Sequence, residues 1–239
     1  MIGENDRESF LELIRPPAFY KLSYCIGTSY SLDLLCLVQL AINSLGKKEE
    51  LADLTIHEGF DILDDFQHKA VIFAQSCKIK AIPKEALEAG TSKRHTFFSL
   101  LDGIVEVIPI LSEYSSFHPK VWVLRFDPIE GEKKAVFKFF TMSRNLTTSL
   151  KWDISTCLVG YFNKNQKKKN KVLIDFISKV MSSSSINKDG KSAILILKAL
   201  KDLQYVEFEM PKGMKKCQFH YKWGQEKTWN FFDLKNYKK

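Results

Sequence analysis

The sequence predicts an α/β fold in which a mixed β-sheet carries helices on both of its faces. Stretches of β-forming residues alternate with helical patterns from residue 20 to residue 125, which is typical of a sheet layer covered by helices. Two apolar runs near the middle of the chain are separated by a short turn, which favours neighbouring strands. With 239 residues, of which 45% are hydrophobic, the chain can bury a substantial core.

The first half of the chain supplies most of the expected helices. A short helical pattern near the N-terminus stops at Pro16 and Pro17, because proline does not fit inside a helix. Ser31 is the expected N-cap of an apolar helix that Gly46 ends. In chain order we expect a helix at 10–14, a strand at 20–30, helices at 32–45 and 57–67, strands at 70–74 and 79–82, a helix at 93–101 and a strand at 104–110.

The second half of the chain places strands before a lysine-rich stretch at 164–171 and helices after it. The central apolar runs have the β-branched and aromatic composition of strands. Beyond the lysines, apolar residues recur at helical spacing. We expect strands at 121–124, 135–142 and 155–162, helices at 172–181 and 192–203, and strands at 205–210 and 217–223, with a further strand at 228–232.

The order of these elements predicts three parts. Residues 1–17 form an N-terminal arm and residues 18–180 form a catalytic lobe. Residues 181–239 form a helical and β-hairpin extension, which is also a candidate for the start of a second lobe.

The constellation that suggests chemistry lies between residues 117 and 153. His118 and Lys120 stand two residues apart at the head of the first central run, and residues i and i+2 of a strand point to the same face. Ser143 and Asn145 share a face in the same way after the second run. If the two runs are neighbours, all four side chains converge at one end of the sheet. A nucleophile, a cation and neutral donors suit a phosphodiester with its charged oxygens.

These residues resemble the motifs of the phospholipase D superfamily. The resemblance rests on His-Pro-Lys at 118–120, on Ser-Arg-Asn-Leu-Thr at 143–147, and on Asp153 before a further strand. It is closest to the bacterial phospholipase D-like branch that includes nucleases and restriction enzymes. The resemblance is strong over 115–160 and extends more weakly from 18 to 180. It implies a phospholipase D-like lobe, which agrees with the α/β prediction.

Two positions depart from the pattern of that family. The acid that the family usually carries five residues after the lysine is Arg125 here, and Asp127 lies two residues further on. The glycine that usually precedes the serine is Met142. The first departure concerns the secondary acid of the motif, and the second concerns the tightness of the turn.

The resemblance implies a metal-independent phosphodiesterase of the nuclease kind, a hydrolase for which defence against foreign DNA is an expected role. It implies that His118 is the nucleophile and forms a covalent phosphohistidine. Lys120 and Asn145 would hold the non-bridging oxygens, and Ser143 would assist them. Asp153 would orient an imidazole or position the lysine. A second histidine from another lobe would protonate the leaving oxygen, and no cofactor is implied.

The chain offers one complete set of these residues, whereas in-line displacement needs a base and an acid on opposite sides of phosphorus. We therefore expect a homodimer, or a second phospholipase D-like lobe, to complete the site. His220 stands in a similar context, Phe-His-Tyr-Lys-Trp, but no Ser-x-Asn follows it, which favours an ordinary aromatic strand. The net charge of +8 favours an anionic partner, and we expect nucleic acid, with DNA preferred.

Several classes of site and of location are disfavoured by the sequence. The five cysteines are widely spaced without a Cys-x-x-Cys pair, and no histidine has metal-ligand spacing, so neither a metal site nor a disulfide framework is expected. No apolar run has the length of a membrane span, and the N-terminus lacks the pattern of a signal peptide. A cytoplasmic location is the expectation.

One function from a different class stays open beside the enzyme. A catalytically degenerate lobe would bind nucleic acid or serve as a dimerisation module, and Arg125 in the place of the usual acid favours it. A lipid substrate is a third hypothesis, which no amphipathic basic helix supports. The sequence leaves open the choice between DNA and RNA and the sequence specificity of cleavage.

Overall fold

The structure, a computed structural model, describes residues 9–47, 55–80, 103–110, 115–131, 133–147, 155–163, 165, 170–211, 213–214 and 217–224. The strands of its main sheet are β1 (Tyr20–Ser29), β3 (Ala70–Gln75), β5 (Val105–Ile108), β6 (Val121–Pro128), β7 (Val136–Met142), β8 (Ser155–Phe162) and β9 (Val206–Phe208). Two short strands, β2 (Leu32–Asp33) and β4 (Ile79–Lys80), pair separately. The described helices are α1 (Phe10–Leu13), α2 (Leu34–Ser44), α3 (Ile56–Gln67), α6 (Lys171–Ser183) and α7 (Lys191–Leu203).

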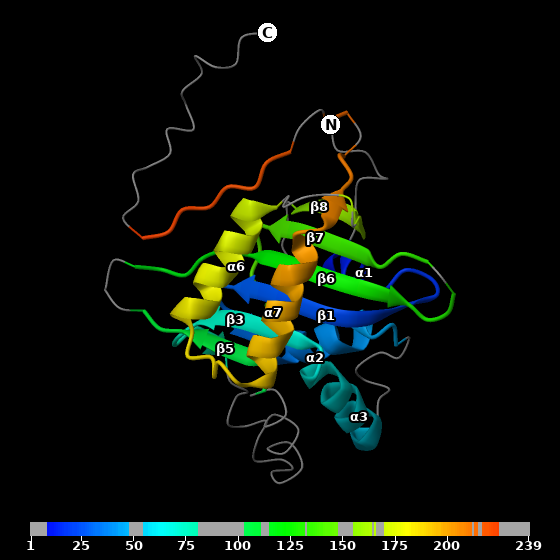
Figure 1. Cartoon of the computed structure of the whole chain (residues 1–239). Helices are drawn as coiled ribbons and strands as arrows, with labels where there is room; N and C mark the ends of the chain where they lie inside the picture. The colour runs from blue at the N-terminus through cyan, green and yellow to red at the C-terminus, as the bar shows by residue number, and fades with distance from the viewer. Residues whose placement is uncertain are drawn as a thin grey trace, which may run out of the picture.

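Seven strands form one mixed sheet in the order β5-β3-β1-β6-β7-β8-β9. β1, β3 and β5 run parallel to one another, and every neighbouring pair from β1 through β6 to β9 is antiparallel. Helices α6 and α7 cross one face, while α1, α2 and α3 lie behind the other (Figure 1). The predicted fold class, α/β with helices on both faces of a mixed sheet, is confirmed.

The sheet separates two hydrophobic cores because its central strands bury both faces. In β6, Trp122 and Leu124 pack into the core beneath α1, α2 and α3, whereas Val121 and Val123 pack into the core beneath α6 and α7. A strand with two buried faces reads as a continuous apolar run, which is the pattern seen at 121–124. The helices contribute apolar stripes at a spacing of three or four residues, such as Phe176, Ile177 and Val180 of α6.

Antiparallel pairing decides which strand ends meet. β6 begins at the end of the sheet where β1 and β7 finish, and this end, on the left in Figure 1, is called the motif end below. At the opposite end, Pro128 at the end of β6 pairs with Tyr20 at the start of β1. The fold thus brings the residues just before β6 beside those just after β7.

Two expected elements are corrected by the structure. The helix expected at 32–45 begins at Leu34, because the backbone of Leu32 and Asp33 pairs with β4 instead, so Ser31 is not its N-cap. The strand expected at 217–223 is an extended segment without a ladder. Its aromatic alternation serves packing on α6, where Phe219 and Tyr221 contact the ring of Phe176.

The other expected elements that fall within the described residues are confirmed, with ends shifted by up to four residues. The helix expected at 93–101 and the strand expected at 228–232 lie outside the described residues. The division of the chain at residue 180 stays a prediction. Beyond that residue, α7 packs on the sheet and β9 extends it. No helix among the described residues has the length and apolarity needed to cross a membrane.

The contact between Gly27 of β1 and Trp122 of β6 yields a stability prediction. The two residues are partners across the strands, and a Cβ atom on Gly27 would lie 2.4 Å from Cζ3 of the buried indole. Gly27→Ala should therefore lower the free energy of unfolding by about 1–3 kcal/mol, the usual cost of overpacking. Urea denaturation measures it, with Gly103→Ala as the control, since a Cβ there lies at an ordinary 3.4 Å from Gln67 Oε1. An unchanged midpoint for Gly27→Ala would contradict this packing.

Candidate active site

The register of β6 and β7 brings the predicted site residues to the motif end. Val121 pairs with Thr141, and the Met142 backbone N–H donates to the Lys120 carbonyl at 3.0 Å. The His-Pro-Lys segment therefore runs beside the turn that follows Met142. Ser143 and Asn145 lie in that turn. Asp153, the fifth predicted site residue, lies outside the described residues.

His118 and Lys120 are in direct contact. The Lys120 ammonium lies 2.7 Å from His118 Nδ1 and 3.2 Å from Nε2, and it donates to the His118 carbonyl at 3.0 Å. The lysine is buried, with 6% of its surface exposed, whereas His118 is exposed. Partial desolvation, followed by the positive charge of Lys120, lowers the pKa of the imidazole. An ammonium can donate only to an unprotonated ring nitrogen, so the contact favours a neutral histidine.

Two buried side chains hold the His-Pro-Lys segment in place. Gln75, the last residue of β3, accepts hydrogen bonds at Oε1 from the Phe117 N–H at 2.8 Å and from the Ser116 hydroxyl at 3.3 Å. On the other side of the segment, the Val121 N–H donates to Thr28 Oγ1 at 2.8 Å, and that hydroxyl donates to the Val121 carbonyl at 3.3 Å. The backbone is thus fixed on both sides of His118 and Lys120.

The turn that carries Asn145 is fixed against the end of β1. The Leu146 N–H donates to Ser29 Oγ at 2.9 Å, and the Asp33 N–H donates to the Leu146 carbonyl at 2.8 Å. Asn145 Oδ1 is buried and has no hydrogen-bond partner among the described residues. A buried acceptor without a partner costs free energy.

Tyr30, directly after β1, completes the described surroundings of His118. Its ring centroid lies 4.8 Å from the imidazole centroid at an interplanar angle of 44°. The ammonium groups of Lys120 and Lys78 lie 6.0 Å and 5.5 Å from the centre of the tyrosine ring. Sequence reasoning missed this tyrosine. The signal for it was a polar and aromatic cluster, Thr-Ser-Tyr at 28–30, at the end of the first strand.

Arg125 lies far from the motif end. It stands five residues beyond Lys120, about 16 Å along the strand at ~3.3 Å per residue. Its guanidinium donates to Asp127 at 2.8 Å and to Asp202 of α7 at 2.7 Å. Burial disfavours its charge, but these hydrogen bonds outweigh burial and raise its pKa. Arg125 therefore serves to attach α7 to the sheet.

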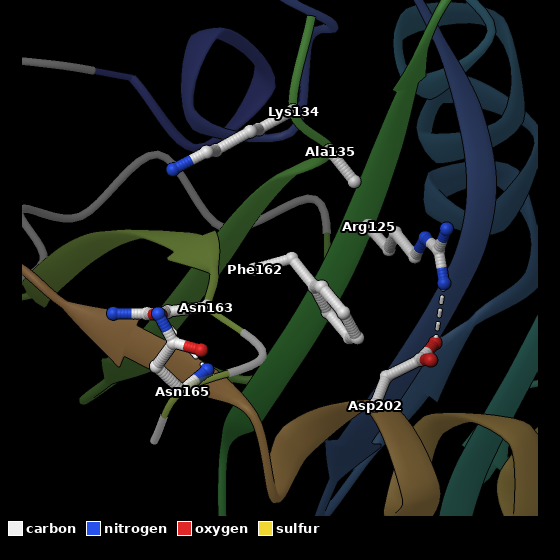
Figure 2. A pocket seen from close by; sticks show the side chains of 7 residues that line it. All are labelled: Arg125, Lys134, Ala135, Phe162, Asn163, Asn165 and Asp202. Atoms are coloured by element: carbon white, nitrogen blue, oxygen red, sulfur yellow. Dashed lines mark hydrogen bonds and ion pairs between the residues drawn. The ribbon is translucent and has the colours of Figure 1, made fainter.

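The ion pair between Arg125 and Asp202 borders a hollow of about 450 Å³. Figure 2 shows the ring of Phe162 between the Arg125–Asp202 pair and the side chains of Asn163 and Asn165. This hollow lies at the end of the sheet opposite the motif end, so it is separate from the predicted site residues. Within the described ranges, no group of three or more His, Cys, Asp or Glu side chains could hold a metal ion.

Comparison with known proteins finds matches among solved structures. No protein-family model and no curated protein sequence matches the chain. A crystal structure of a mutant yeast tyrosyl-DNA phosphodiesterase aligns with 82% of this chain and 36% of its own, at 18% identity and a TM-score of 0.43. The chain spans little more than a third of that enzyme's length.

The contact between Lys120 and His118 predicts how the imidazole titrates. By NMR, we expect the His118 midpoint below the ordinary histidine pKa of about 6.5. Lys120→Met should raise the midpoint, because it removes the neighbouring positive charge, although the desolvation remains. Lys201→Met, at an exposed position of α7, is the control and should leave it in place. A His118 midpoint that does not respond to Lys120→Met would contradict the contact.

Proposed function

We propose that this chain is a phospholipase D-like phosphodiesterase, a metal-independent nuclease that acts through a covalent phosphohistidine at His118. The observation that carries the proposal is the meeting, at one end of two paired strands, of His118 and Lys120 with the turn that holds Ser143 and Asn145. Defence against foreign DNA is the biological role that we propose with it.

The chemistry assigned to His118 is a double displacement. A lone pair on a ring nitrogen attacks phosphorus, so that a P–N bond forms while the P–O bond to the leaving alcohol breaks. The leaving oxygen takes a proton from a second imidazolium. Water then attacks phosphorus and gives a proton to the second imidazole, the P–N bond breaks, and His118 returns to its first state. The lowered pKa of His118 supports this role, because a neutral ring has the lone pair that the attack requires.

Lys120 has a double role in this scheme. In the free chain its ammonium lies against both ring nitrogens of His118. A phosphodiester is an anion and attracts the ammonium more strongly than a neutral imidazole does. The arriving phosphate would draw Lys120 onto a non-bridging oxygen and release the lone pair of His118. Asn145 and Ser143 would donate to the remaining oxygens, and Asp153 would orient a histidine.

The alternative of a catalytically degenerate lobe rested on Arg125. The guanidinium of that residue is paired with Asp127 and Asp202 at the other end of β6. Its presence is therefore explained by packing, and it does not bear on the surroundings of His118. A degenerate lobe would bind nucleic acid without cleaving it, so the same assay separates the two functions.

We expect cleavage of a phosphodiester in the presence of EDTA, because the site uses a histidine and a lysine. His118→Ala should abolish turnover, while Lys120→Met and Asn145→Ala should each lower the rate by about 10² or more, the scale for removing a donor that stabilises developing charge. Labelled DNA, labelled RNA and a generic aryl phosphodiester are the substrates. His68→Ala, at an exposed position after α3, is the matched control and should keep the wild-type rate. Activity that needs an added divalent ion would contradict the proposal.

We further propose that a second copy, or a second lobe, supplies the acid of the first step. Two-fold pairing would place His118 of each chain across one shared cleft, and isologous dimers are the commonest assemblies. We expect specific activity to fall on dilution together with the fraction of dimer in sedimentation velocity. Mixing inactive His118→Ala chains with wild-type chains should depress the activity per wild-type chain. Full activity from a species shown to be monomeric would contradict the shared site.

A further inference from the structure

Tyr30 presents an aromatic ring beside the proposed nucleophile. The ring is half-buried, it lies at the motif end directly after β1, and it contacts the His118 imidazole with centroids 4.8 Å apart. The proposed reaction assigns it no task. A tilted arrangement of 44° packs one region of the tyrosine against the histidine and leaves the ring partly accessible.

Cationic side chains lie near this ring. Lys78 and Lys80, on the turn after β3 and on β4, are exposed, and the Lys78 ammonium lies 5.5 Å from the centre of the Tyr30 ring. The Lys80 ammonium lies 4.0 Å from Oδ2 of Asp33, which is a buried acid. The exposed Lys78 and the buried Lys120 thus both lie near the Tyr30 ring, and Lys80 is exposed two residues along the chain from Lys78. A polyanion with regularly spaced phosphates matches such a group of cations.

A flat ring beside cations and a phosphate site fits a nucleobase. Bases stack on aromatic side chains with little regard to sequence, and each stack strengthens binding by about 5- to 150-fold. The exposed Lys78 contact with the ring is weaker, worth about 2- to 5-fold in an equilibrium constant. An arriving base would therefore displace Lys78 from the ring onto a neighbouring phosphate. A base inside a duplex cannot reach the ring, because its faces are already stacked.

We propose that Tyr30, Lys78 and Lys80 form a platform that binds single-stranded nucleic acid, with one base stacked on Tyr30 next to the phosphate held at His118. Single-stranded nucleic acid is thus the substrate class of the phosphodiesterase proposed above. The position of the scissile phosphate beside the platform rests on that proposed function. The stacking itself is measured by binding and does not depend on turnover.

The test compares two five-unit oligomers with phosphorothioate linkages, one of thymidine and one of abasic sugar, with equal charge. Binding is measured by fluorescence anisotropy in low salt. The wild-type chain should bind the thymidine oligomer at least 5-fold more tightly than the abasic one. Tyr30→Leu should lose that preference, and Tyr30→Phe should keep it because the ring remains. A uridine pentamer and a short thymidine–adenine duplex, measured alongside, compare RNA with DNA and single strands with duplex.

Charge variants provide a second measurement that does not depend on the folding of Tyr30→Leu. Lys78→Gln should weaken the binding of both oligomers and reduce the dependence of binding on salt by about one counterion. The base preference should be kept or increased, because a base no longer has to displace the ammonium from the ring. Tyr161→Leu, at an exposed position of β8, and Lys201→Gln, at an exposed position of α7, are the matched controls. Both should bind as the wild type does.

The outcomes separate the platform from the proposed reaction. A base preference that depends on Tyr30, found in a chain that cleaves nothing, would support the platform and contradict the phosphodiesterase. Cleavage with equal binding of the thymidine and abasic oligomers would overturn the platform and leave the phosphodiesterase standing. Tighter binding of the duplex than of the single strand would also overturn it.

Discussion

The pairing of β6 between β1 and β7 is the constraint on which the rest of this structure depends. The hydroxyl of Thr28 fixes Val121 on one side, and the N–H of Met142 fixes the Lys120 carbonyl on the other. A slip of one residue in either pairing would turn every side chain of that strand to the opposite face. The buried indole of Trp122 opposes such a slip, because a side chain with a Cβ atom in the place of Gly27 would clash with it. A core contact therefore determines the geometry of the motif end.

The two ends of β6 carry cations with different tasks. At the far end, Arg125 is neutralised by two carboxylates and joins α7 to the sheet. Lys120 at the motif end lies against the imidazole of His118. The two residues are about 16 Å apart along the strand, at ~3.3 Å per residue, and the guanidinium is paired with two carboxylates. Arg125, which stands in the place of the acid usual in the phospholipase D superfamily, is thus electrostatically remote from His118.

Much of this arrangement could be predicted from the sequence, because it depends on local patterns. Two-residue spacing put His118 with Lys120, and strand order placed them beside the turn of Asn145. The roles of Gln75 and Ser29 could not be predicted, since they act on backbone 42 and 117 residues away and exist only once the sheet has formed. For the segment at 217–223, the sequence predicts a strand that the structure does not form. Its alternation was genuine, but alternation specifies which side chains are buried and not whether the backbone has a partner.

The long sequence separations that hold the motif end together also bear on how the chain folds. Thr28 and Val121 are 93 residues apart, and Ser29 and Leu146 are 117 apart. Closing such loops costs chain entropy before any contact is gained, so folds of high contact order form slowly. The contact of His118 with Tyr30 cannot exist before β6 has joined β1. Any signal from that ring pair in a refolding chain therefore reports a late event, the completion of the central sheet.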